Sequence, residues 1–194
     1  QALPLLEGFA GRVVVLYGDT PFISAETLAA LAAHPADVVV LGFEAADPGR
    51  YGRLIVKGDT LDRIVEFKDA DEATRQVALC NSGVMAVEAA LLADLVGRLG
   101  NDNAAGEYYL TDIVGLARAE GRTAAVVTCD EAETLGINTR VELAAAEAAF
   151  QARKRAEAVE AGVALADPAT VWFAPDTAIG RDAVIGQNVV FGPG

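Results

Sequence analysis

Cysteine, histidine and basic residues are scarce in this chain. Its 194 residues include two cysteines, one histidine and 15 lysines and arginines, against 28 aspartates and glutamates. Cys80 and Cys129 lie far apart and form no CxxC or histidine-spaced motif, so we expect buried, reduced thiols and neither a structural disulfide nor a zinc site. The net charge of −13 argues against nucleic acid as a partner, because proteins that bind the phosphate backbone present a basic face. Small anionic substrates are compatible with this charge if a metal ion and a few local cations offset it.

Long apolar runs are also absent. No run approaches the roughly 20 residues that a membrane span needs, and no basic-then-apolar leader opens the chain. We therefore expect a soluble protein of the cytoplasm. The hydrophobic content of 53% is sufficient for one good core plus an appendage.

Strand-like and helix-like segments alternate up to about residue 130. Apolar, often β-branched runs predict strands, and Gly58-Asp59 within one longer run predicts the turn of a hairpin. Ser24 is the expected N-cap of the first helix. We predict an α/β fold with a mainly parallel sheet flanked by helices. The expected strands are 12–17, 36–45 and 123–129, the hairpin is 52–67, and the helices are 24–34, 87–99 and 110–121.

The character of the sequence changes near Arg140. An alanine-rich segment, 141–162, predicts a long connecting helix that ends near Gly162. Beyond it, Ile179, Ile185 and Phe191 recur every six residues, and a glycine follows each. This period resembles the hexapeptide repeat of left-handed parallel β-helices, so 163–194 is expected to be the start of one. A flexible tail with chance periodicity is the alternative.

Gly18 and Asp19 stand where the first expected strand ends. In an open parallel sheet, ligands bind beyond the carboxyl ends of the strands. Glycine lets a ligand approach the backbone, and aspartate offers a hard oxygen to Mg²⁺. From these residues alone, Asp19 fits equally well as a cap of the following turn.

Six short motifs occur in order at wide spacing: "LYGDTPFI", "YGRLIV", "IVEFKDA", "NSGV", "GEYYLTDIV" and "GINTR". The series resembles the uridyltransferase domain of the bifunctional bacterial N-acetylglucosamine-1-phosphate uridyltransferase/glucosamine-1-phosphate acetyltransferase family. The resemblance extends over nearly the whole chain. It implies a Rossmann-like nucleotidyltransferase domain over 1–140, a linker helix over 141–162, and the first turns of the acetyltransferase β-helix over 163–194.

The resemblance also assigns a nucleotide and metal site. It gives Tyr17, Gly18 and Asp19 contacts with the nucleotide-sugar, and it makes Asp19 and Asn138 the two catalytic ligands of Mg²⁺. One carboxylate and one amide oxygen suit this ion, because Mg²⁺ usually keeps water and phosphate oxygens as its other ligands.

Three further residues match positions that hold the N-acetylglucosamine group. They are Gly52, Glu66 and Asn81, and a carboxylate with an amide suits sugar hydroxyls and an acetamido group. Each has a structural alternative. Gly52 could serve a turn, Glu66 could pair with Lys68 on an exposed strand, and Asn81 could belong to a turn.

The resemblance implies a reaction in which N-acetylglucosamine 1-phosphate attacks the α-phosphorus of UTP and gives UDP-N-acetylglucosamine and pyrophosphate. Acetyl transfer from acetyl-CoA to glucosamine 1-phosphate, and a homotrimer formed through the β-helix, are implied for the intact protein. Relatives begin with a strand and a glycine-rich phosphate loop that we do not find here, so we expect the chain to be the middle of a larger enzyme and inactive by itself. Another sugar-1-phosphate nucleotidyltransferase and a non-catalytic assembly piece are the alternatives.

Overall fold

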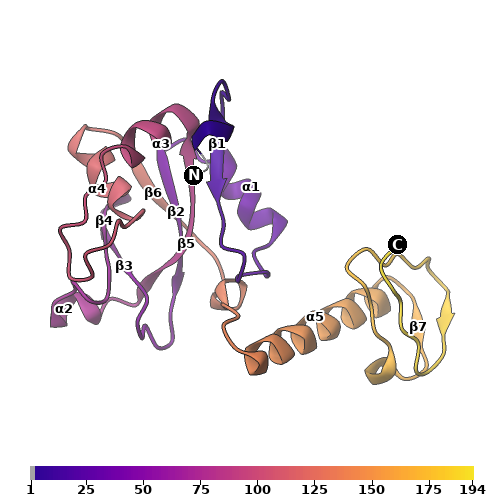
Figure 1. Cartoon of the computed structure of the whole chain (residues 1–194). Helices are drawn as coiled ribbons and strands as arrows, with labels where there is room; N and C mark the ends of the chain where they lie inside the picture. The colour runs from indigo at the N-terminus through magenta and orange to yellow at the C-terminus, as the bar shows by residue number, and fades with distance from the viewer. Residues whose placement is uncertain (1–2) are drawn as a thin grey trace. The chain divides into compact units, whose positions relative to one another are not determined.

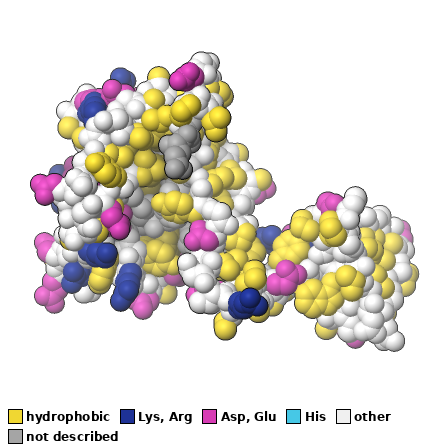
Figure 2. Space-filling model, viewed as in Figure 1, with side chains coloured by type: hydrophobic (Ala, Val, Ile, Leu, Met, Phe, Trp, Pro, Cys, Tyr) yellow, Lys and Arg dark blue, Asp and Glu magenta, His cyan; other side chains and the backbone are white. Residues whose placement is uncertain are grey.

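The computed structural model describes residues 3–194 and divides the chain into two compact units, Gln1–Gly136 and Ile137–Gly194. On the face drawn in Figure 2, acidic side chains lie among hydrophobic ones, and basic side chains form small dispersed groups. Among the described residues, no helix combines the length and the apolar character that crossing a membrane requires.

The first unit is a six-stranded sheet with helices packed against it (Figure 1). The strand order is β4-β3-β5-β2-β6, and β1 also pairs with β5. The strands are β1 (Arg12–Val15), β2 (Val38–Glu44), β3 (Arg53–Lys57), β4 (Thr60–Val65), β5 (Leu79–Glu88) and β6 (Ala124–Thr128). The α-helices are α1 (Ala25–Ala33), α2 (Glu72–Arg75), α3 (Ala89–Val96) and α4 (Asp112–Ala119), and the 3₁₀ helices are η1 (Leu3–Leu6) and η2 (Glu131–Thr134).

The prediction of a mainly parallel sheet was wrong, because the sheet is mixed. Of the pairings among described strands in this sheet, that of β2 with β6 is parallel, and those of β5 with β1, β2 and β3 and of β3 with β4 are antiparallel. Strand β5 lies between β1 and β2 and runs opposite to both. The β3–β4 hairpin was predicted correctly, with Gly58 at a positive φ of 61° in its turn.

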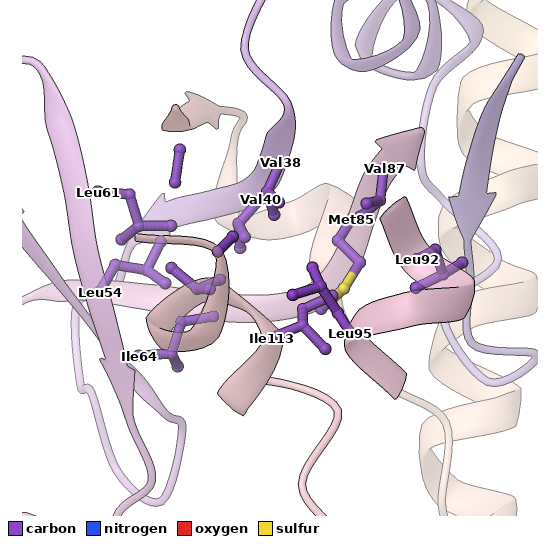
Figure 3. Close-up of a cluster of buried hydrophobic side chains, with 13 residues drawn as sticks. Val38, Val40, Leu54, Leu61, Ile64, Met85, Val87, Leu92, Leu95 and Ile113 are labelled. Atoms are coloured by element: carbon purple, nitrogen blue, oxygen red, sulfur yellow. The ribbon is translucent and has the colours of Figure 1, made fainter. Parts of the chain in front are cut away.

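The core of the first unit lies on both faces of β2 and β5. Successive β2 side chains point to opposite faces, as the period of a strand requires. Val38 and Val40 pack in a cluster that includes residues of α3 and α4 (Figure 3), and Val39 and Leu41 pack in a second cluster with Leu31 of α1. Apolar side chains thus cover both faces of β2 and β5.

Side chains form hydrogen bonds with backbone groups at both ends of α1. Ser24 is its N-cap, as predicted, and the Ser24 hydroxyl accepts a hydrogen bond from the Thr27 backbone N–H at 3.1 Å. At the other end the Arg12 guanidinium donates to the carbonyls of Leu31, His34 and Ala36 at 3.3, 2.6 and 2.5 Å. A cation at the C-terminal end of a helix also suits the helix dipole.

The second unit begins with a long helix and continues as extended chain. Helix α5 (Arg140–Glu160) starts with a capping box between Thr139 and Glu142. Two short strands, β7 (Ala164–Leu165) and β8 (Val184–Ile185), pair in parallel, and η3 (Pro168–Thr170) lies between them in the chain. Trp172 and Val190 form a further parallel bridge.

Candidate functional site

Tyr17 and Gly83 bring two of the six motifs into contact. Gly83 has a φ of +85°, and a Cβ built on it would lie 1.9 Å from Cε2 of Tyr17. The tyrosine ring therefore occupies the space of the missing side chain, which only glycine leaves open. Tyr17 is still 48% exposed, so the outer part of its ring faces solvent.

Gly52 connects the other two sugar-site candidates. Its carbonyl accepts a hydrogen bond from the Asn81 backbone N–H at 2.8 Å. A Cβ built on Gly52 would lie 3.3 and 3.4 Å from the two carboxylate oxygens of Glu66, so the backbone of Gly52 lies directly against that carboxylate. Gly52 thus contacts both Glu66 and Asn81, which a residue that serves only a turn would not need to do.

Glu66 has a partner that differs from the one considered in its structural alternative. Its Oε1 accepts a hydrogen bond from the Thr111 hydroxyl at 3.0 Å, and no ion pair with Lys68 occurs among the described residues. Thr111 is the N-cap of α4, but its side chain makes no capping hydrogen bond. The threonine of "GEYYLTD" thus orients the carboxylate instead of the helix end.

Asn81 is nearly buried and takes part in a local turn. Its Oδ1 accepts a hydrogen bond from the Gly83 N–H at 2.9 Å. Within residues 3–194 its amide nitrogen donates to no protein group, so this donor is free for a ligand. The turn alternative is correct for Oδ1 and leaves Nδ2 available.

Asp19 lies in the exposed turn that follows β1 and Tyr17. Helix α1 is capped by Ser24, so Asp19 is not its cap. Among the described residues the Asp19 carboxylate forms no hydrogen bond or ion pair. Burial, followed by the negative charges of Glu66 and Asp19, raises the pKa of Tyr17, so each of these two carboxylates lies within electrostatic reach of the Tyr17 hydroxyl. Gly18 is exposed, and a Cβ on it would meet no atom within 4 Å.

Asn138 belongs to the second unit, just before α5. Its backbone N–H donates to Oε2 of Glu142 at 2.7 Å, next to the capping box. This bond fixes the backbone and leaves the side-chain amide without a described partner.

A cleft of about 470 Å³ opens beside Glu66. Its lining residues are Arg50, Glu66, Phe67, Lys68, Glu107 and Tyr109. The cleft combines an aromatic wall with donors and acceptors, the composition that a sugar-sized ligand requires.

The structure therefore brings Tyr17, Gly52, Glu66 and Asn81 together in the first unit. Sequence reasoning did not single out Gly83 and Thr111, which hold Tyr17 and Glu66 in place. Both lie within quoted motifs, "NSGV" and "GEYYLTDIV", so the signal was present. Among the described residues, no group of three or more histidines, cysteines or acidic residues forms a metal centre.

No protein-family model matches the chain. The chain is 75% identical over 184 residues to the bifunctional protein GlmU of Paracoccus denitrificans, covering 95% of this chain and 41% of that protein. It is 65% identical over 194 residues to the bifunctional protein GlmU of Roseobacter denitrificans, covering 99% of this chain and 43% of that protein.

Two solved structures share the fold. One is a nucleoside-diphosphate-sugar pyrophosphorylase from Vibrio cholerae, with a TM-score of 0.53, 12% identity, and coverage of 74% of this chain and 59% of that one. The other is a Bacillus anthracis protein provisionally assigned as a glucose-1-phosphate thymidylyltransferase, with a TM-score of 0.52, 22% identity, and coverage of 77% and 59%. The fold is therefore that of the sugar nucleotidyltransferases. By sequence, the chain is a close homologue of the bifunctional GlmU proteins and spans about two-fifths of their length.

Proposed function

We propose that this chain carries the sugar-phosphate site of a uridyltransferase that converts UTP and N-acetylglucosamine 1-phosphate into UDP-N-acetylglucosamine and pyrophosphate. The observation that carries the proposal is the contact of Gly52 with both Glu66 and Asn81. The homology to GlmU proteins and the order of the six motifs support the same conclusion.

The sugar is held by groups that match its chemistry. The Glu66 carboxylate accepts from sugar hydroxyls, while Thr111 keeps it oriented. The free Nδ2 of Asn81 donates to an oxygen of the sugar or of its acetamido group. Gly52 has no side chain, so the sugar can approach the backbone closely.

The phosphates are placed at the end of β1 in this proposal. Tyr17, Gly18 and Asp19 contact the nucleotide-sugar, and the attacking oxygen belongs to the substrate, so the protein mainly orients the reactants. Asp19 and Asn138 fit Mg²⁺ in their chemistry: a carboxylate that has no partner among the described residues and one amide oxygen leave room for water and phosphate ligands. When bound, the ion would neutralise charge on the phosphates.

We propose three parts for the whole chain: the uridyltransferase domain over 1–140, a connecting helix over 141–162, and the start of a left-handed β-helix over 163–194. The six-residue period and the parallel pairing of β7 with β8 support this. In the intact protein the β-helix would form a homotrimer and transfer acetyl groups from acetyl-CoA to glucosamine 1-phosphate. Its place is the cytoplasm.

A chimeric enzyme tests the uridyltransferase proposal. This chain replaces its homologous segment in the Paracoccus denitrificans GlmU, and pyrophosphate release is measured with N-acetylglucosamine 1-phosphate, Mg²⁺ and UTP, dTTP or ATP. Turnover with UTP supports the proposal. Turnover with dTTP or ATP instead would favour a different sugar nucleotidyltransferase, and a folded chimera that neither turns over nor binds the sugar phosphate would favour an assembly role.

A further inference from the structure

Arg53 is a buried cation that has no acidic partner in the described part of the chain. It is 1% exposed and heads the fully buried side chains in size. Its guanidinium forms no ion pair within residues 3–194. Burying a charge without a counter-charge is costly, so the hydrogen bonds of the Arg53 guanidinium must offset the loss of its hydration.

These hydrogen bonds go to backbone carbonyls on two separate loops. Nε and Nη2 donate to the carbonyl of Arg75 at 3.3 and 3.1 Å, at the end of α2. Nη2 also donates to the carbonyl of Gly49 at 3.1 Å, and Nη1 donates to the carbonyl of Tyr51. The Tyr51 and Phe43 rings pack edge to face, with ring centroids 4.9 Å apart, and this contact anchors the same loop in the core.

The hydrogen bonds of Arg53 fix the position of Gly52, which lies between Tyr51 and Arg53 in the chain. Its carbonyl binds the Asn81 N–H, and its Cα faces the Glu66 carboxylate. If the preceding carbonyl moved, Gly52 would shift against both residues that we assign to the sugar.

A second connection runs through Arg75. Its Nη2 donates to the Phe67 carbonyl at 3.2 Å, and its guanidinium lies 4.5 Å from the Phe67 ring centroid. Phe67 follows Glu66 directly and lines the cleft. Arg53 therefore restrains two segments beside the Glu66 carboxylate: Gly52, through the Tyr51 carbonyl, and Phe67, through Arg75.

We infer that Arg53 is a positioning residue that holds Gly52 and Glu66 at the spacing that the sugar phosphate needs. This rests on the proposed function. A planar guanidinium reaches carbonyls on separate segments at once, whereas the compact ammonium of lysine reaches fewer. Arg53 acts through the backbone and touches no substrate in this account.

The test uses the active chimera with Arg53→Met and Arg53→Lys, and Arg12→Met as the matched control. Arg12 also donates to three backbone carbonyls, but those belong to the end of α1, away from Gly52 and Glu66. All variants are assayed well below their unfolding temperatures. We expect Arg53→Met to raise the KM for N-acetylglucosamine 1-phosphate about tenfold and the KM for UTP less than about twofold, since lost hydrogen bonds of this kind are worth about that factor. Arg53→Lys should rescue part of the loss, which also covers the case in which Arg53→Met does not fold.

Two outcomes would overturn the inference. One is an equal rise of both KM values in the Arg53 variants, and the other is the same selective rise in Arg12→Met. A parent chimera without uridylyl transfer would instead overturn the proposed function, so the two failures are distinguishable.

Discussion

The two units stabilise themselves by different means. The first unit buries apolar residues on both faces of β2 and β5, in clusters that contain Met85 on one side and Leu31 on the other. The second unit leaves Val184 and Val190 77% and 73% exposed. Its interior contains Val163, Val171, Phe173 and Ala174 and, beside them, the buried Gln151 of α5. The Gln151 amide accepts from the Phe173 N–H and donates to the Phe173 carbonyl, both at 2.8 Å.

The first unit thus has an extensive apolar core of its own, whereas the second unit leaves apolar side chains exposed. If the second unit is the start of a β-helix, as proposed, further repeats would stack on it and cover its faces, because solenoid repeats bury their faces against their neighbours. The first unit has a core that can position a site precisely. We expect chemistry in the first unit and assembly in the second, with Asn138 as the exception.

The largest expected effect concerns the two proposed Mg²⁺ ligands, Asp19 and Asn138. Asp19→Asn in the chimera should lower turnover by about 10²–10³-fold, because a charge near the transferring phosphoryl group is lost. If Asn138 is a ligand of the same ion, as proposed, Asn138→Ala should act in the same direction, and the double variant should lose less than the product of the two. Steady-state rates over a Mg²⁺ titration measure this.

Asp59→Asn, in the exposed turn between β3 and β4, is the control and should leave turnover unchanged. Fully multiplicative losses would contradict the proposal that Asp19 and Asn138 are ligands of one ion.

Removing core volume should affect the first unit alone. Met85 is fully buried in the cluster of Figure 3, so Met85→Ala should cost about 2–5 kcal/mol of that unit's stability. Hydrogen exchange read by mass spectrometry should show faster exchange in β2 and β5 and unchanged exchange in α5. An equal effect in α5 would show that the units unfold together.

The counterpart in the second unit is Gln151, which is 2% exposed. Gln151→Leu leaves the Phe173 N–H and carbonyl without their partner, which should cost about 1–3 kcal/mol. The same exchange experiment should show the loss around 171–174. Gln187→Leu, at an exposed position, should have no such effect, and similar losses in both variants would contradict this account of the second unit.

The smallest effect concerns the thiols, both of which lie in the first unit. Burial, followed by the charges of Glu133 and Asp130, raises the pKa of Cys129 from 9.0 to about 11. The thiol therefore stays protonated in the folded chain between pH 9 and 11, where the unfolded chain would already lose the proton, so this group makes folding less favourable as pH rises through that range. In a Cys80→Ala variant, reaction with a disulfide reagent should be slow at pH 8 and accelerate toward pH 11. A rate that levels off near pH 9 would contradict the raised pKa.

Local patterns in the sequence predicted the local structure well. The Ser24 cap, the turn at Gly58 and the helix from Arg140 were all visible because each depends on residues close in sequence. The pairing of β5 between β1 and β2 was not predictable in this way, because it depends on contacts between distant strands.

The candidate site shows the same limit. The motif series named Glu66 and Asn81, but it did not predict that Thr111 would orient the carboxylate, because a threonine before a helix suggests a cap. Arg53 was hidden for a similar reason: a charged residue in a hairpin strand is expected to face solvent.

The most direct test of the sugar site is the pair of KM values in the chimera with Glu66→Ala. The control is Glu133→Ala, which removes a carboxylate of the same unit that accepts from the Ser24 N–H at 2.8 Å. We predict that Glu66→Ala raises the KM for N-acetylglucosamine 1-phosphate by about 10- to 100-fold, the value of a lost ligand hydrogen bond, with little change for UTP. Glu133→Ala should change neither. An effect of Glu66→Ala confined to UTP, or an unchanged KM for the sugar phosphate, would contradict the assignment of this site.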